Sequence, residues 1–215
     1  MSFPFRAALY GLVLAFCATP LPAQPTRPAA SPRRSTSESP RPSPKPQPRP
    51  HGTRVEVDPV RIVVDDGDSV AIRWPGAGEE VVRILGIDTP EVRHPEHDIP
   101  YAQAFGPEAR AFAMGAFAAA TRAELLRAAT LDPYGRSLGY LFLDGRNYSV
   151  LVLKARLAEE SVSRYGDNGF PKEAAEVLAA AREQGPLAFE PPADYRTRMR
   201  ELSRAMKARG EYSER

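Results

Sequence analysis

A long proline-rich segment without large apolar side chains limits how much of this 215-residue chain can fold. Residues 24–52 contain nine prolines and no Val, Ile, Leu, Met, Phe, Trp or Tyr. Such a segment cannot build a core, and proline favours an extended backbone. It carries six positive charges and one negative charge, so the rest of the chain has a net negative charge. We predict a disordered, unpacked linker over 24–52, whose removal leaves the stability unchanged.

The first 23 residues have the pattern of an export signal. Arg6 precedes an uncharged, mostly apolar run over residues 7–19, and Leu21-Pro22-Ala23 resembles a signal-peptidase site. The run is shorter than the roughly 20 apolar residues that span a bilayer, which argues against a retained anchor. We predict a signal peptide at 1–23, a secreted protein (periplasmic or extracellular), and no membrane span in the mature chain.

The cysteine and histidine content excludes several kinds of site. The only cysteine, Cys17, lies in the predicted signal peptide, where the bulky Phe16 before it disfavours lipid attachment. The mature chain would therefore have no disulfide, no cysteine nucleophile and no zinc–cysteine cluster. One of the three histidines lies in the linker, so a three-histidine zinc site is excluded unless the linker contributes.

The rest of the sequence alternates strand-type and helix-type runs. We expect strands at 60–64, 69–74, 81–87 and 138–143, and helices at 107–119 and 172–184. Short strands followed by helices favour a small α+β barrel with helices packed outside it. We expect the charged segment 189–215 to be a tail, with helix-forming residues beyond Asp194 that have little to bury.

The strands at 69–74 and 81–87 are expected to form a hairpin. We place Trp74 opposite Val81. This register puts Asp68 opposite Ile87, one position before Asp88. Because diagonal neighbours lie about 7 to 8 Å apart, the carboxylates of Asp68 and Asp88 are expected to meet at the open end of the hairpin.

Four short motifs contain the residues whose side chains are suited to metal binding or catalysis. They are Asp66-Gly67-Asp68-Ser69, Arg83, Asp88-Thr89-Pro90-Glu91 and Asp132-Pro133-Tyr134-Gly135-Arg136. Taken singly, each has a simpler explanation, because Asp-Gly pairs form turns and an arginine in a strand can face solvent. Twelve-residue EF-hand loops counted from these aspartates lack either the terminal glutamate or the oxygen ligand at the third position.

Together the motifs fit metal-assisted hydrolysis of a phosphodiester. The candidate metal ligands are oxygen atoms of Asp68, Asp88 and Thr89. Such hard oxygen ligands suit calcium, which takes six to eight of them. Glu91 follows closely and can act as general base on a water molecule. Arg83 and Arg136 carry permanently charged guanidinium groups that match phosphate oxygens.

The chain resembles the thermonuclease (staphylococcal nuclease) family from about Arg61 to Gly185. The motifs that carry the resemblance are Asp-Gly-Asp-Ser-Val, Arg-Ile-Leu-Gly-Ile-Asp-Thr-Pro-Glu, Gly-Pro-Glu-Ala and Asp-Pro-Tyr-Gly-Arg, in this order. The resemblance implies an α+β fold over 53–188, an OB-fold five-stranded β-barrel with packed helices. It also implies a calcium-dependent endonuclease that hydrolyses DNA and RNA and leaves 3′-phosphate ends.

The resemblance assigns a role to each site residue. It matches the Ca²⁺ ligands to Asp68, Asp88 and Thr89, the catalytic residues to Arg83, Glu91 and Arg136, and the substrate-binding residues to Tyr134 and Tyr165. Ser149 would start a helix, although residues 149–153 favour a strand by propensity. We follow the resemblance and expect the helix.

Three positions depart from the family pattern. Pro133 replaces a lysine near the terminal phosphate, and a tyrosine pair is reduced to Tyr165. Arg156 stands at a helix end where the family has glycine. A left-handed backbone there would cost arginine roughly 1 kcal/mol.

Two other functions compete with a nuclease. The same barrel without its catalytic residues would be a non-catalytic nucleic-acid-binding module, and a secreted calcium buffer would need only the aspartates. All six matched metal and catalytic positions are retained, and a calcium buffer gives Arg83 and Arg136 no purpose. We therefore expect an enzyme, monomeric and with no stable protein partner, whose substrates are DNA and RNA.

Overall fold

The computed structural model describes residues 44–212. The predicted signal peptide and the larger part of the predicted linker lie outside this range. None of the helices within this range has the length and apolar content to cross a membrane.

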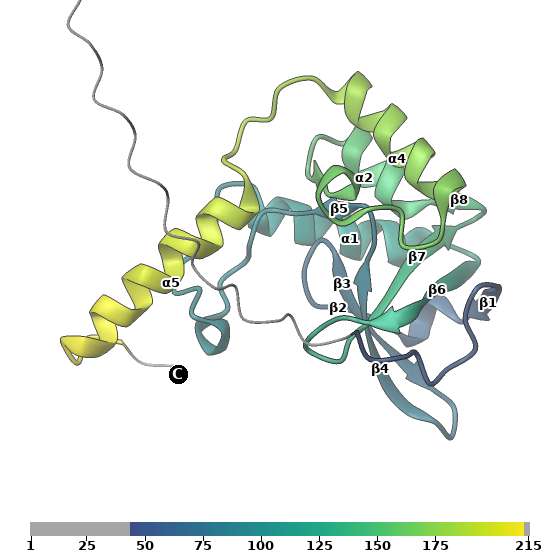
Figure 1. Cartoon of the computed structure of the whole chain (residues 1–215), viewed down its shortest axis with the longest axis horizontal. Helices are drawn as coiled ribbons and strands as arrows, with labels where there is room; N and C mark the ends of the chain where they lie inside the picture. The colour runs from purple at the N-terminus through teal and green to yellow at the C-terminus, as the bar shows by residue number, and fades with distance from the viewer. Residues whose placement is uncertain (1–43, 213–215) are drawn as a thin grey trace, which may run out of the picture. The chain divides into compact units, whose positions relative to one another are not determined.

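A curled β-sheet forms the centre of the fold (Figure 1). Over residues 44–212, its strands run in the order β1-β6-β7-β4-β3-β2, with β8 beside β7. Their bounds are β1 Arg54–Val57, β2 Ile62–Val64, β3 Ser69–Trp74, β4 Gly78–Ile84, β6 Ala123–Leu131, β7 Ser137–Leu143 and β8 Arg146–Asn147. Neighbouring strands are antiparallel except β4 and β7, which are parallel. Strands β2, β3, β4, β7 and β6 form the expected OB-fold sheet, which β1 and β8 extend.

Three of the five helices of residues 44–212 pack on this sheet and enclose the main core. The helices are α1 Gly106–Ala119, α2 Tyr148–Lys154, α3 Val162–Tyr165, α4 Pro171–Gln184 and α5 Pro192–Ala208, with short 3-10 turns at Pro59–Arg61 and Pro95–His97. Strands β5 (Ile87–Asp88) and β9 (Glu159–Glu160) pair separately. Apolar residues of the sheet pack with α1, α2 and α4 in one buried cluster. The predicted α+β fold is confirmed.

The segment of conflicting propensity is helical. Helix α2 begins at Tyr148, one residue before the expected start, and the Asn147 side chain caps it by accepting a hydrogen bond from the Ser149 N–H. Val152 and Leu153 are fully buried in the main core. Capping and tertiary packing therefore override the strand propensity of this run.

The predicted register of the β3–β4 hairpin is wrong. Trp74 pairs with Gly78, and not with Val81, so the turn contains only three residues. Gly78 has a φ of +71°, in the left-handed region that glycine adopts readily. Strand β4 begins early because Glu80, expected in the loop, lies inside the barrel and accepts a hydrogen bond of 2.7 Å from Trp74 Nε1. Asp68 consequently lies opposite Ile84, whose N–H donates to its carbonyl.

The last residues of the predicted linker pack on the barrel. Gln47 is buried, its N–H donates to the Ala129 carbonyl of β6, and its Nε2 donates to Ser137 Oγ at 2.9 Å. The Gly52 N–H donates to the carbonyl of Arg127. The prediction of an unpacked linker up to Gly52 is therefore wrong for this end. Its contacts are hydrogen bonds, which the absence of apolar residues does not exclude.

Helix α5 buries more than its composition suggested. Tyr195 and Met199 pack with Ile99 in a second apolar cluster. The Ser203 hydroxyl donates to Asp98 Oδ1 at 2.7 Å. The expectation that this segment has little to bury is wrong, because a narrow stripe at i and i+4 suffices to attach one face of the helix.

Candidate active site

A tight turn before β3 positions Asp68. The Asp68 N–H donates to Asp66 Oδ1 at 2.9 Å, and the buried Tyr148 hydroxyl donates to the Gly67 carbonyl at 2.7 Å. A Cβ atom at Gly67 would lie 2.8 Å from the Thr89 side chain, so only glycine permits this approach. Asp68 Oδ2 then accepts a 2.7 Å hydrogen bond from the Thr89 N–H.

Arg83 on β4 lies between the two predicted carboxylate ligands. Its Nη1 contacts Asp68 Oδ1, and its Nη2 donates to Asp88 Oδ1 at 2.8 Å. Asp68 and Asp88 are only 1% and 3% exposed, so their charges are compensated mainly inside the protein. The structure therefore brings the two aspartates together, although the register that predicted it was wrong.

Short β-pairing holds Asp88 and places another carboxylate beside it. Asp88 of β5 pairs directly with Glu159 of β9. Burial and the nearby Asp88 charge raise the pKa of Glu159. For Asp88 itself, burial favours the protonated form, but the guanidinium groups of Arg196 and Arg83 outweigh burial and lower its pKa. The ionised state of Asp88 thus depends on two arginines.

Glu91 is fixed by its backbone and shielded from solvent. Its N–H donates to Gln103 Oε1 at 3.2 Å, and its carbonyl accepts from the Gln103 N–H at 2.8 Å. Gly106 lies so close to the Glu91 carbonyl that a Cβ atom there would approach it to 2.1 Å. Burial raises the pKa of Glu91, although Arg196 opposes the increase.

Arg196 of α5 also belongs to this cluster, although it is not among the site residues predicted from the sequence. Its Nη1 lies 2.9 Å from Asp88 Oδ1 and 2.5 Å from Glu91 Oε1, and its Nη2 lies 2.7 Å from Asp88 Oδ2. Arg196 is one of several arginines on a charged helix, at a sequence distance of more than 100 residues from its partners. No local signal in the sequence marks it, because the adjacent apolar residue, Tyr195, does not share a helix face with Arg196.

Arg136 approaches the cluster from the turn before β7. Its N–H donates to Asp132 Oδ1 at 2.8 Å and its Nε to Asp132 Oδ2 at 2.6 Å. Its Nη1 lies 3.4 Å from the hydroxyl of Ser69, the neighbour of Asp68. Tyr134 on the same turn is 79% exposed, and the Arg136 guanidinium lies 5.6 Å from its ring centroid.

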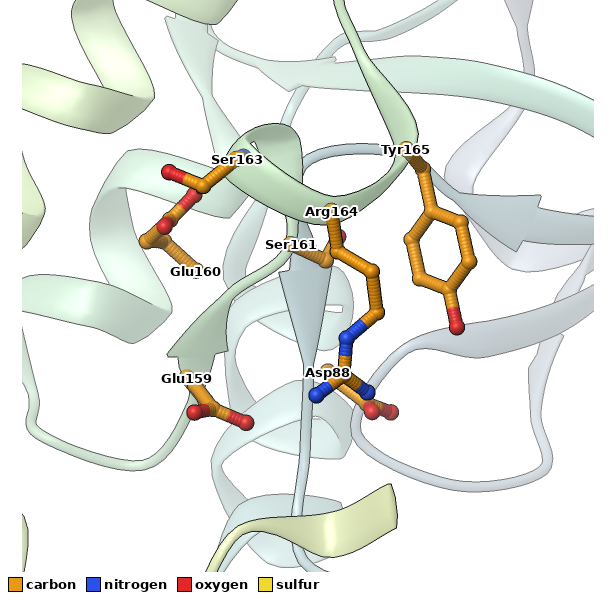
Figure 2. Close-up of a pocket in the computed structure, with 7 residues that line it drawn as sticks. All are labelled: Asp88, Glu159, Glu160, Ser161, Ser163, Arg164 and Tyr165. Atoms are coloured by element: carbon orange, nitrogen blue, oxygen red, sulfur yellow. The ribbon is translucent and has the colours of Figure 1, made fainter. Parts of the chain in front are cut away.

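A pocket opens on the other side of Asp88, between β9 and α3. Its lining residues are Asp88, Glu159, Glu160, Ser161, Ser163, Arg164 and Tyr165. Figure 2 shows the Arg164 side chain directed toward Asp88, with the Tyr165 ring beside it. Tyr165 is 63% exposed. It lies at the entrance to this pocket, whereas Tyr134 lies on the turn that carries Arg136.

The donor atoms present fit a calcium ion. Asp68 and Asp88 provide carboxylate oxygens, and the hydrogen bond from the Thr89 N–H to Asp68 Oδ2 holds the backbone of Thr89 next to Asp68. Both buried carboxylates already contact guanidinium groups, so this position attracts cations. A second group, with ligand atoms of Asp65, Asp66 and His94 within 4.8 Å of one another, is less suited to calcium because of its imidazole.

Comparison with known proteins identifies a family for the central part of the chain. Residues 81–185 match the family described as staphylococcal nuclease homologue. This range includes Arg83, Asp88, Thr89, Glu91 and Arg136. Asp68 precedes it and Arg196 follows it.

Proposed function

Because the chain belongs to the staphylococcal nuclease homologue family, we propose that it is a calcium-dependent nuclease that hydrolyses phosphodiester bonds in DNA and RNA. One observation carries this proposal: Asp68, Asp88 and Glu91 converge with Arg83 in a single cluster at one end of the barrel. Hard oxygen ligands, a shielded carboxylate and guanidinium groups are the components that phosphodiester hydrolysis needs.

In the proposed mechanism, Asp68, Asp88 and the Thr89 carbonyl would hold calcium, which would supply positive charge next to a phosphate oxygen. Glu91 takes a proton from the attacking water. The raised pKa of Glu91 supports this role, because it makes the carboxylate a stronger base than an exposed glutamate.

The arginines and tyrosines complete the proposed site. Arg83 and Arg136 donate hydrogen bonds to phosphate oxygens and stabilise the charge that accumulates there in the transition state. Tyr165 at the entrance to the pocket and Tyr134 on the Arg136 turn bind the substrate, since exposed aromatic rings can stack on bases. We also propose that the protein is secreted, to the periplasm or the medium, and acts as a monomer.

A nuclease assay on the mature chain tests this function. Plasmid DNA and RNA should be cut in calcium and left intact in excess EGTA. Magnesium should substitute poorly, because it requires near-octahedral geometry and loses water reluctantly. Cutting at the full rate in EGTA would contradict the metal assignment. Calcium-dependent DNA binding without cutting would favour the alternative, a non-catalytic nucleic-acid-binding module of the same family.

Single substitutions test whether this protein, and not a contaminating nuclease, is the source of the activity. Glu91→Gln, Arg83→Ala and Arg136→Ala should each lower turnover by at least about 100-fold, as the loss of a general base or of transition-state stabilisation does. Arg200→Ala removes an exposed arginine of α5 and should cut at the wild-type rate. Circular dichroism should show the same fold for all four variants. Near wild-type turnover of either Arg83→Ala or Arg136→Ala would remove that arginine from the mechanism.

A further inference from the structure

The guanidinium of Arg196 binds the two carboxylates that have the most direct roles in the proposed reaction. It forms a two-pronged contact with Asp88, at 2.9 and 2.7 Å, and a 2.5 Å contact with Glu91. Arg196 is itself largely shielded, with 21% of its side chain exposed. A contact this direct neutralises a proposed metal ligand and the proposed general base together.

We propose that Arg196 competes with calcium for Asp88. In the metal-free protein the Arg196 guanidinium binds Asp88 and Glu91, and it must leave Asp88 when calcium binds. This inference rests on the proposed function. It adds a regulatory contact from α5, which lies outside the segment matched to the nuclease family.

Charge and geometry make the two cations compete for Asp88. Arginine does not lose its proton in proteins, so its positive charge remains while it stays in the site. Arg196 donates hydrogen bonds to both oxygens of Asp88, so a calcium ion on this carboxylate would lie close to the guanidinium and the two positive charges would repel each other. Calcium binding is therefore coupled to breaking the contacts between Arg196 and Asp88.

The attachment of α5 permits this exchange. The helix is held by Tyr195 and Met199 in their own apolar cluster, and by the hydrogen bond from Ser203 to Asp98. None of these contacts involves the guanidinium of Arg196. The side chain of Arg196 has several rotatable bonds, so it can leave the carboxylates while the helix remains attached.

Calcium titration of the metal-free mature chain by calorimetry tests the competition. Arg196→Gln should lower the Kd for calcium by at least about tenfold, because a charge-assisted contact that opposes binding is lost. Arg196→Lys keeps the charge but loses the planar guanidinium, so its Kd for calcium should lie between those of wild type and Arg196→Gln. Arg200→Gln removes the same charge from an exposed position of α5, and its Kd should stay within about twofold of wild type.

Thermal unfolding gives a second readout that does not depend on activity. Without calcium, Arg196→Gln should have a lower Tm than wild type, because Asp88 and Glu91 lose their shared counter-ion. In saturating calcium the difference should shrink, since Arg196 no longer binds Asp88 in either protein. If Arg196→Gln does not fold without metal, Arg196→Lys replaces it in both the calcium titration and the thermal unfolding.

Two results would overturn the proposal, and only one of them would also contradict the proposed metal site. An unchanged or higher Kd for Arg196→Gln, with calcium binding and nuclease activity intact in wild type, would exclude competition and leave the proposed function standing. Such a result with a raised KM would make Arg196 a substrate ligand. Failure of wild type and variant alike to bind calcium would remove the metal site together with the competition.

Discussion

Glu80 shows how much of the barrel depends on one buried charge. Its carboxylate accepts hydrogen bonds from Arg127 Nε at 2.7 Å and Nη2 at 2.8 Å, from Ser137 Oγ at 2.6 Å and from Trp74 Nε1 at 2.7 Å. Burial favours the protonated form, but the contacts with Arg127 and the two neutral donors outweigh it, and the pKa of Glu80 is lowered. The ionised pair therefore stabilises the fold.

Glu80→Gln should lower the free energy of unfolding by about 3 kcal/mol or more at neutral pH, because it leaves Arg127 buried without its counter-ion. A lowered pKa gives stability that is complete above the ordinary carboxyl value of 4.5 and is lost as the pH falls toward the folded-state pKa. Denaturant unfolding between pH 7 and 3 should therefore show the difference from wild type shrinking below about pH 4.5.

Glu79→Gln is the matched control for this prediction. Glu79 is the preceding residue of β4, and its side chain is 53% exposed beside Arg73. Exposed pairs contribute about 0 to 1 kcal/mol, so this variant should unfold close to wild type at every pH. If Glu80→Gln lowers the free energy of unfolding equally at all pH values, the charge of Glu80 is not the cause of the lost stability.

Arg156 has an unfavourable backbone conformation at the end of α2. Its φ is +62°, in the left-handed region expected at this helix end. Arg156→Gly should raise the free energy of unfolding by about 1 kcal/mol, since glycine adopts this region without a Cβ clash. The gain is reduced by the lost hydrogen bond from Arg156 to the Pro186 carbonyl. Arg156→Ala loses that bond and keeps the strain, so its Tm should not rise.

At the scale of elements, the last residues of the proline-rich segment form a polar cover for one barrel edge. The Arg127 Nη1 donates to the Pro50 carbonyl at 3.1 Å, and Arg49 lies 3.7 Å from Glu80. Together with buried Gln47, these residues complete the environment of the Glu80–Arg127 pair. Strand β6, which β1 pairs only at residues 123–126, is thereby paired further along its length.

Two nested deletions separate this cover from the rest of the linker. Removal of residues 24–43 should leave the Tm unchanged, because it keeps the hydrogen bonds of Lys45, Gln47 and Gly52 with β6. Removal of 24–52 should lower the Tm by about 4 °C or more, since each lost kcal/mol shifts a domain of this size by about 2 to 4 °C. Gln47→Ala in the full chain should show part of that loss. Equal Tm values for both deletions would mean that residues 44–52 contribute no stability.

The elements that the sequence predicted well are those whose signals are local. Helix α1 has Pro107 in its first turn, and its Ala113 and Phe117 are buried as their helical spacing indicates. The predicted hairpin register was wrong because it left Glu80 in the loop. In the structure Glu80 is buried in the strand, and its counter-ion is the distant Arg127. The Gln47 contacts were not predicted for a similar reason. A composition without apolar residues predicts that no apolar core forms, but it says nothing about hydrogen bonds to a distant strand.

At the scale of the whole molecule, the candidate site is assembled from segments far apart in the chain. Asp68 precedes β3, Asp88 lies on β5, and Arg196 comes from the last helix. Motif spacing predicted the first two, because each lies in a recognisable local pattern. Nothing local distinguishes Arg196 from the other arginines of α5. The charged residues predicted for the site were therefore two aspartates, one glutamate and two arginines, without the cation that binds Asp88 and Glu91 together.

The arrangement of this cluster also predicts the ends of the cut strands. Glu91 lies beside Asp88, whereas Arg136 reaches the neighbourhood of Asp68 from a separate turn through Ser69. Arg136 is therefore placed to stabilise a leaving oxygen away from the water that Glu91 activates. Family resemblance makes that oxygen the 5′ one, so digests should end in 3′-phosphates that block a polymerase until a phosphatase removes them. Products with 5′-phosphate and 3′-hydroxyl ends would show that the roles of Glu91 and Arg136 are assigned wrongly, even if both residues prove essential.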